Sequence, residues 1–155
     1  MSYLSRRNAV TRMIQLNADG TQTGAVNGDK IKLPTKTTTG GDSVSITAAG
    51  VISLSSSFDY YIRIEPDLER SIKTSDVQLD FYNESTSSTM TQAQGAMSCR
   101  MLPTQTAYPD QSGVEMGQLI ISQPSHDISI RLSQLGSNSC DINIGFHLFI
   151  VEIEA

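Results

Sequence analysis

Apolar and polar residues alternate along several short segments, and this alternation limits the folds open to the chain. The clearest segment is 58–65, in which every second residue is apolar: Phe58, Tyr60, Ile62 and Ile64. Successive side chains of a β-strand point to opposite faces, so a strand with one buried face has this pattern. The segment is therefore predicted to be a half-buried strand with Tyr61 on its outward side.

Eight further segments show strand character, and turn-forming residues separate them. With the first segment, they are 30–33, 43–47, 51–54, 58–65, 77–82, 98–102, 116–122, 127–132 and 141–154. Charged residues make up 17% of the chain, below the roughly 25% of an ordinary domain, and Ser and Thr take their place. No repeat of a propeller or solenoid is visible. The chain is predicted to be all-β, as an eight- to nine-stranded jelly-roll sandwich.

Residues 1–28 lack a clear alternation and are predicted to be an N-terminal arm or short helix with a turn-rich lead-in. Arg6, Arg7 and Arg12 precede the first carboxylate, Asp19. The predicted organisation is therefore an arm over 1–28 and a jelly-roll domain over 29–155.

Charge and hydropathy exclude several classes of protein. The net charge of -5 and the pI of about 4.8 argue against binding to nucleic acid, which needs a basic surface. No apolar run is long enough to cross a membrane. The first residues do not form a secretory signal, so we expect synthesis in a cytoplasm, from which the protein leaves, if at all, by lysis or assembly.

The last predicted strand is apolar on both faces near its end. Phe149, Val151 and Ile153 continue the face on which Asn143 and His147 lie. An apolar stripe on the outward face of a sandwich needs a cover. A second polypeptide, the N-terminal arm or an intrachain loop are the three candidates.

Side chains suited to catalysis or metal binding are few. His126 and His147 are the only histidines, and neither lies in a recognisable catalytic motif. Cys99 and Cys140 are predicted to be reduced, partly buried thiols, with a bridge between them as the alternative. We expect no enzyme, no metal and no cofactor. The polar loops 82–89 and 103–113 are expected to be solvated, with contact to a glycan as the alternative.

The order of the strands resembles the C1q/TNF-like jelly roll found in virion proteins of tailed bacteriophages. The matching residues lie in three strands: Ile52 and Leu54, then Tyr60, Tyr61 and Ile62, then Leu148, Ile150 and Ile153. The resemblance implies a homotrimer in which the outer sheet of each subunit faces the threefold axis. The expected trimer interface is then Tyr61, Phe149, Val151 and Ile153.

In phages, such trimers serve as capsid decoration (cement) proteins, head fibres or tail-tip knobs. This chain has no collagen-like stalk or heptad repeat before the jelly roll, which favours a protein seated directly on a shell. The resemblance thus implies a decoration protein on the capsid exterior that clamps the major capsid protein. The expected capsid-binding arm residues are Leu4, Arg6, Arg7, Arg12, Met13 and Ile14. The alternatives are a head-fibre or tail knob that binds a host surface glycan, and a soluble enzyme or lectin unrelated to virions.

Overall fold

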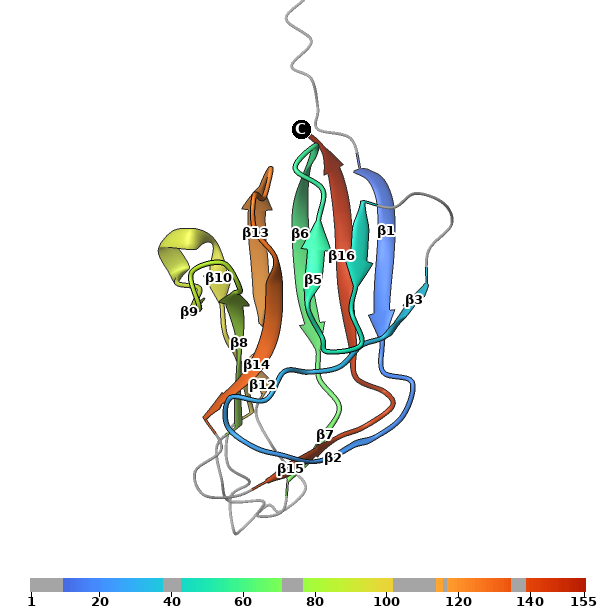
Figure 1. The fold of residues 1–155 in the computed structure, drawn as a ribbon, viewed down its shortest axis with the longest axis vertical. Coiled ribbons are helices and arrows are strands. Elements are labelled where there is room, and N and C mark those ends of the chain that lie inside the picture. Colours follow the sequence, from blue (N-terminus) through green and yellow to red (C-terminus); the bar gives the residue numbers. More distant parts are fainter. Residues whose placement is uncertain (1–9, 38–42, 71–76, 102–113, 116, 135–138) are drawn as a thin grey trace, which may run out of the picture.

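The computed structural model describes residues 10–37, 43–70, 77–101, 114–115, 117–134 and 139–155. Regular structure in these residues is β, apart from one 3-10 turn, η1 (Gln92–Gln94). None of the described helices is long and apolar enough to cross a membrane. The strands form two large sheets and one small sheet (Figure 1). The predicted all-β class is confirmed.

The first large sheet has six antiparallel strands. In spatial order they are β10 (Ala96–Met97), β13 (Gln118–Ser122), β6 (Phe58–Glu65), β16 (His147–Glu154), β1 (Val10–Asn17) and β3 (Thr35–Thr37). The eight residues of β16 pair along their whole length with the eight residues of β6. The last strand of the chain therefore lies in the middle of this sheet, between β6 and β1.

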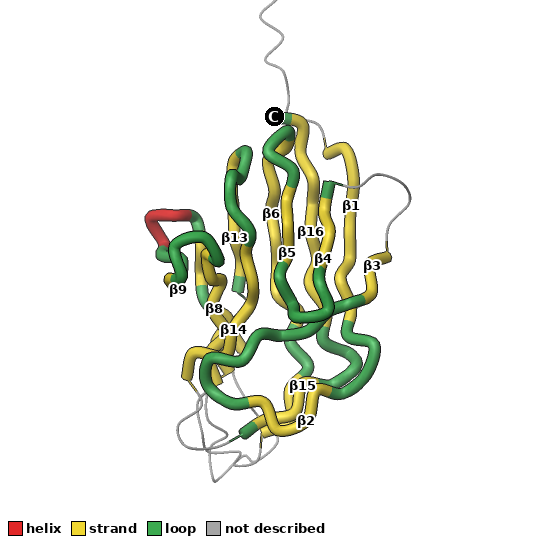
Figure 2. The backbone as a smooth tube through the Cα atoms, in the orientation of Figure 1, coloured by secondary structure: helices red, strands yellow, loops and turns green. Residues whose placement is uncertain are grey.

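The second large sheet has seven strands and packs against the first. Its order is β12 (Val114–Glu115), β11 (Cys99–Met101), β8 (Val77–Asn83), β14 (Ile128–Gln134), β5 (Ile52–Leu54) and β4 (Val44–Ile46), with β9 (Ser88–Thr89) beside β8. The small sheet contains β2 (Gln22–Ala25), β15 (Cys140–Ile142) and β7 (Leu68–Arg70). Figure 2 shows it at the end of the sandwich opposite to the C-terminus.

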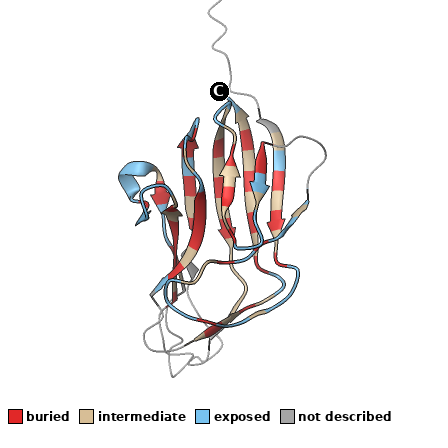
Figure 3. Ribbon diagram, viewed as in Figure 1, coloured by how far each residue is buried: buried red, intermediate tan, exposed pale blue. Residues whose placement is uncertain are grey.

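The core lies between the two large sheets and follows the alternation of the strands. Buried and half-buried residues alternate along β6 and β16, as the colours of Figure 3 show. The largest fully buried side chains are Tyr60, Phe81 and Phe146. The buried Tyr60 hydroxyl donates to a backbone oxygen, with Ser43 O at 3.3 Å and Ser55 O at 3.2 Å, so its polar atom is satisfied.

The structure corrects the prediction for residues 10–28. Residues 10–17 form β1 between β16 and β3, and residues 22–25 form β2, so neither segment is an arm or a helix. The reason is the register of β1, in which Ile14 and Leu16 face the core with exposures of 2% and 0%. The sandwich therefore begins at Val10 among the described residues, well before residue 29.

The last predicted strand is also corrected, because it is broken. Residues 143–146 turn between β15 and β16, and Ile144 is 66% exposed there. The Gly145 amide donates to Oδ2 of Asp67 at 3.1 Å, and a Cβ at Gly145 would lie 2.3 Å from that oxygen. The hydrogen bond from the Gly145 amide to Asp67 holds this turn, and a side chain at residue 145 would have to displace the Asp67 carboxylate.

Candidate interaction surface

The outward face of the six-stranded sheet carries a continuous apolar row. The strand register pairs Met13 with Val151, Val151 with Tyr61, and Tyr61 with Ile120. Four neighbouring strands therefore each place one large side chain in the same line. Met13 and Ile120 are 57% and 61% exposed. Such a row is unusual on the solvent side of a sandwich.

The neighbouring row, toward the small sheet, mixes apolar and polar side chains. It contains Gln15, Phe149, Arg63, Gln118 and Met97. The guanidinium carbon of Arg63 lies 5.7 Å from the Phe149 ring centre, and its Nη2 lies 2.5 Å from Oε1 of Glu65. The Tyr61 hydroxyl donates to Oε1 of Gln118 at 3.2 Å. These contacts hold the polar groups in place beside the apolar row.

The four predicted interface residues share this face. Tyr61 lies on β6, and Phe149, Val151 and Ile153 lie on β16, all half-buried. Their part in a trimer contact stays a prediction. Sequence reasoning missed Ile120, although the alternation of β13 places it opposite to the buried Leu119 and Ile121.

The structure separates the predicted arm residues. Leu4, Arg6 and Arg7 lie outside the described residues. Ile14 points into the core, so it is not available to anchor the chain to another protein. Met13 points outward and belongs to the apolar row. We therefore correct the assignment of Ile14 and Met13 to an arm.

Arg12 is the remaining arm residue, and its half-buried side chain pairs with a buried carboxylate. Its Nη1 lies 3.8 Å from Oε2 of Glu152, whose exposed fraction is 0%. The Ser43 hydroxyl donates to the same carboxylate oxygen. Burial raises the pKa of the neighbouring Tyr60, and the Glu152 charge adds to this rise. Arg12 thus compensates the charge of a carboxylate inside the sandwich.

The outward face of the seven-stranded sheet is polar, in contrast to the apolar row. Glu84 accepts hydrogen bonds there from Lys30 Nζ at 2.9 Å, Arg131 Nη2 at 3.1 Å and Ser129 Oγ at 2.5 Å. Burial alone would raise the pKa of Glu84, but these hydrogen bonds and the Arg131 charge lower it to about 2. Arg131 also stacks on Tyr82, with 3.6 Å between Cζ and the ring centre. Glu84, Lys30, Ser129 and Arg131 thus form one connected polar network on this face.

The two cysteines are free thiols, as predicted, but they are fully rather than partly buried. Burial raises the pKa of the Cys99 thiol. Burial, with the carboxylates of Asp141 and Asp29, raises the pKa of Cys140 to about 11. Both side chains therefore remain neutral thiols near pH 7.

The two histidines lie apart. His147 is on β16, opposite Glu65, with Nδ1 2.9 Å from the Gly145 carbonyl oxygen. His126 precedes β14, and its buried Nε2 has no hydrogen-bond partner among the described residues. Asp127 accepts a hydrogen bond from Ser53 Oγ at 2.7 Å. Within the part of the chain that the structure describes, no three His, Cys, Asp or Glu residues gather as metal ligands would.

Comparison with known proteins identifies the fold. No protein-family model matches the chain, and no curated protein matches it either. Among solved structures, the Eiger TNF from S. frugiperda aligns with a TM-score of 0.60 and 11% identity, over 94% of this chain and 93% of that chain. Murine APRIL aligns with a TM-score of 0.54 and 12% identity, over 91% and 98%.

A third similar structure is PRD1 vertex protein P5. It aligns with a TM-score of 0.52 and 15% identity, over 94% of this chain and 98% of that chain. Each alignment spans nearly the whole of both chains, so the likeness concerns the complete sandwich. The chain has the TNF-like jelly-roll fold.

Proposed function

We propose that this chain is a structural virion protein that assembles as a homotrimer and decorates a capsid. The observation that carries the proposal is the outward row Met13, Val151, Tyr61 and Ile120, which crosses four strands of one sheet. Fully burying an apolar side chain of this size contributes about 1.5–3 kcal/mol. Copies of the chain that cover this face would thus be held together mainly by apolar contact.

The difference between the two outward faces supports this choice of surface. The seven-stranded sheet pairs its outward charges internally through Glu84, Lys30 and Arg131. The six-stranded sheet instead exposes Met13, Met97 and Ile120 by about half or more of their area. Large exposed apolar patches mark protein contacts. We therefore expect the outward face of the seven-stranded sheet to stay in contact with solvent and that of the six-stranded sheet to contact another protein.

The TNF-like fold and the resemblance to phage virion proteins support the virion role. One solved structure with this fold is named a vertex protein. The proposed mechanism is mechanical: each trimer contacts several major capsid subunits and adds binding free energy that resists expansion of the shell. Three attachment points on one trimer raise the effective concentration of each contact. No catalytic step is part of this function.

The oligomeric state of the free protein is the first test. Light scattering at micromolar concentration should give three times the mass of 16.8 kDa. A monomer at this concentration would overturn the trimer and favour the soluble enzyme or lectin.

Binding to the capsid shell is the second test, and it uses a deletion variant that keeps β1 intact. A deletion into residues 10–17 would remove β1 from the sheet, so only residues 2–9, with Leu4, Arg6 and Arg7, are deleted. The truncated protein should stay trimeric but no longer decorate shells. Decoration at full occupancy would overturn the arm as the capsid contact.

A receptor-binding knob is the alternative function, and a polar hollow bordered by Ser125 and His126 favours it. Copy number separates the two functions. Hundreds of copies in each virion indicate decoration, and a few to tens indicate a fibre or tail protein.

A further inference from the structure

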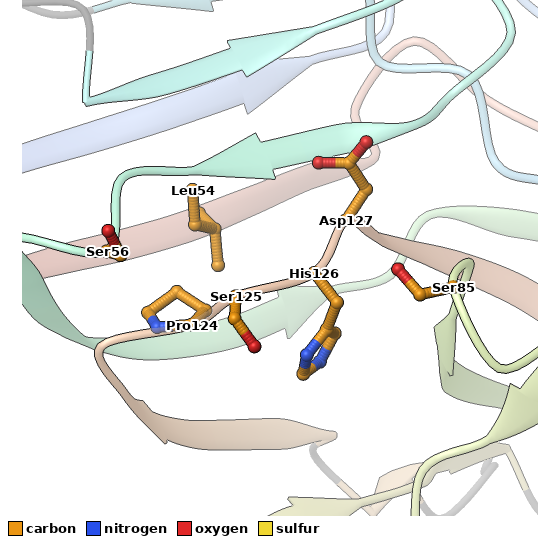
Figure 4. A pocket seen from close by; sticks show the side chains of 7 residues that line it. All are labelled: Leu54, Ser56, Ser85, Pro124, Ser125, His126 and Asp127. Carbon is orange, nitrogen blue, oxygen red and sulfur yellow. The ribbon is translucent and has the colours of Figure 1, made fainter.

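A hollow of about 380 Å³ lies at the end of the sandwich where β16 finishes. Figure 4 labels its seven lining residues. They come from β5 and the turn that follows it, from the turn between β8 and β9, and from the connection between β13 and β14. From this hollow we infer a binding site for a neutral saccharide, separate from the apolar row.

The turns around the hollow are fixed by hydrogen bonds. Asn83 Oδ1 accepts from the amides of Ser85 at 2.9 Å and Thr86 at 3.1 Å. The Gln123 amide donates to Phe58 O at 3.1 Å and to Asp59 Oδ1 at 3.2 Å. A ligand therefore meets preformed walls, which lowers the entropy lost on binding.

Backbone strain gathers in the same turns. Ser87, with φ 52°, and Gln123, with φ 41°, are the non-glycine residues with positive φ in the described ranges. Side chains other than glycine adopt this conformation at a cost, and such residues cluster at ligand sites. Both strained positions lie within two residues of a lining residue, Ser85 or Pro124.

The polar groups of the hollow are available for a ligand. The hydroxyls of Ser56, Ser85 and Ser125 make no hydrogen bond to another described residue. Asp127 uses Oδ1 to accept from Ser53, which leaves Oδ2. The imidazole of His126 also borders the hollow, although its Nε2 is buried and has no described hydrogen-bond partner.

The chemistry of this lining selects the ligand class. Among the described residues, no Lys or Arg lines the hollow, and the Asp127 carboxylate repels anions, so phosphate and sulfate do not fit. One carboxylate and one imidazole are too few to hold a divalent cation. Three hydroxyls and one carboxylate oxygen suit a neutral ligand rich in hydroxyl groups. Leu54 and Pro124 add an apolar surface for the C–H face of a sugar ring.

This site does not depend on the proposed trimer. None of the lining residues belongs to the row formed by Met13, Val151, Tyr61 and Ile120. It also moves the alternative of a glycan contact to a different set of residues. The hollow uses Ser85 from the predicted loop 82–89, together with residues 124–127, while loop 103–113 lies outside the described residues.

The test is a titration of the ¹⁵N-labelled full chain with glucose, galactose and N-acetylglucosamine, followed by NMR. At least one sugar should shift the amide signals of residues 54–57, 84–87 and 123–128 and leave the rest unchanged. The double variant Ser85→Ala/Ser125→Ala should weaken binding about tenfold, because it removes two hydrogen-bonding hydroxyls. Ser45→Ala, on the exposed side of β4, is the matched control and should bind as the parent does.

Three results would overturn the saccharide site: no shift with any sugar, equal binding by the double variant, or shifts only with phosphate or calcium. Light scattering on the same sample separates this outcome from that of the trimer. A monomer that binds sugar overturns the trimer alone, and a trimer without sugar binding overturns the hollow alone.

Discussion

Arg12 of β1 lies with Nη1 3.8 Å from Oε2 of Glu152 on β16, and Glu152 is completely buried. The two residues are also direct partners in the strand register. A carboxylate in the core persists only where charges and donors compensate its loss of hydration. Arg12 and Ser43 provide this compensation and tie β1 to the centre of the six-stranded sheet.

Replacing Arg12→Ala should destabilise the protein, because the buried Glu152 carboxylate loses its guanidinium. The expected loss in the free energy of unfolding is about 3 kcal/mol, measured by urea denaturation. Arg12→Lys keeps a positive charge and should lose less. Equal stability of the parent and Arg12→Ala would contradict this function of Arg12.

Glu84 should make stability depend on pH in acid. Its pKa in the folded protein is about 2, below its usual 4.5, so the unfolded chain binds the proton more readily. The stabilisation is therefore complete above about pH 5 and is lost as the pH falls toward 2. Glu84→Gln should lower stability at pH 7 by about 2 kcal/mol and flatten the pH profile between pH 5 and pH 2.

The measurement for Glu84 is urea denaturation at a series of pH values. Asp19→Asn, at an exposed residue, is the control and should keep the profile of the parent. A Glu84→Gln profile as steep as that of the parent would place the acid sensitivity elsewhere.

The strands with one apolar face were predictable from sequence because their pattern is local. Segment 58–65 matches β6 residue for residue, and the outward positions of Phe149, Val151 and Ile153 follow from the same alternation. A period of two fixes which side chains share a face without any knowledge of the partner strand.

Strand β1 could not be recognised, because its inward positions include Arg12. A charged residue at a core position makes sense only with Glu152, which lies 140 residues later in the chain. The apolar row and the hollow could not be predicted either, because each depends on contacts between residues far apart in the chain. Their members come from distant strands and turns, and only the register brings Met13 beside Val151.

The cysteines should be unreactive in the folded protein. Both side chains are buried, and burial raises the pKa of both thiols, for Cys140 to about 11. Since the thiolate is the nucleophile, a disulfide reagent at pH 7.5 should label neither Cys99 nor Cys140 in minutes. Denaturant should release two thiols at once. Rapid labelling of the native protein would show that the buried positions open.

Gly50 should not tolerate a side chain, for two separable reasons. Its φ is +86°, and a Cβ there would lie 2.4 Å from the Ile31 carbonyl oxygen. Gly50→Ala should therefore lose more than the roughly 1–3 kcal/mol of backbone strain alone. Gly24→Ala is the control that measures the backbone strain alone, because Gly24 has φ +66° and open space around its Cβ position. If Gly24→Ala and Gly50→Ala lower the melting temperature equally, the contact with Ile31 does not contribute to the loss of stability.

A charge in the apolar row should break the assembly. Val151→Asp places a carboxylate between Met13 and Tyr61, where a neighbouring copy would bury it without a partner. We expect monomers or insoluble protein, measured by light scattering and by solubility. Ile144→Asp is the matched control, because Ile144 is 66% exposed in the turn before β16 and lies outside the row. The control should stay trimeric and soluble. A Val151→Asp protein that is as trimeric and as stable as this control would move the subunit contact to another face of the sandwich.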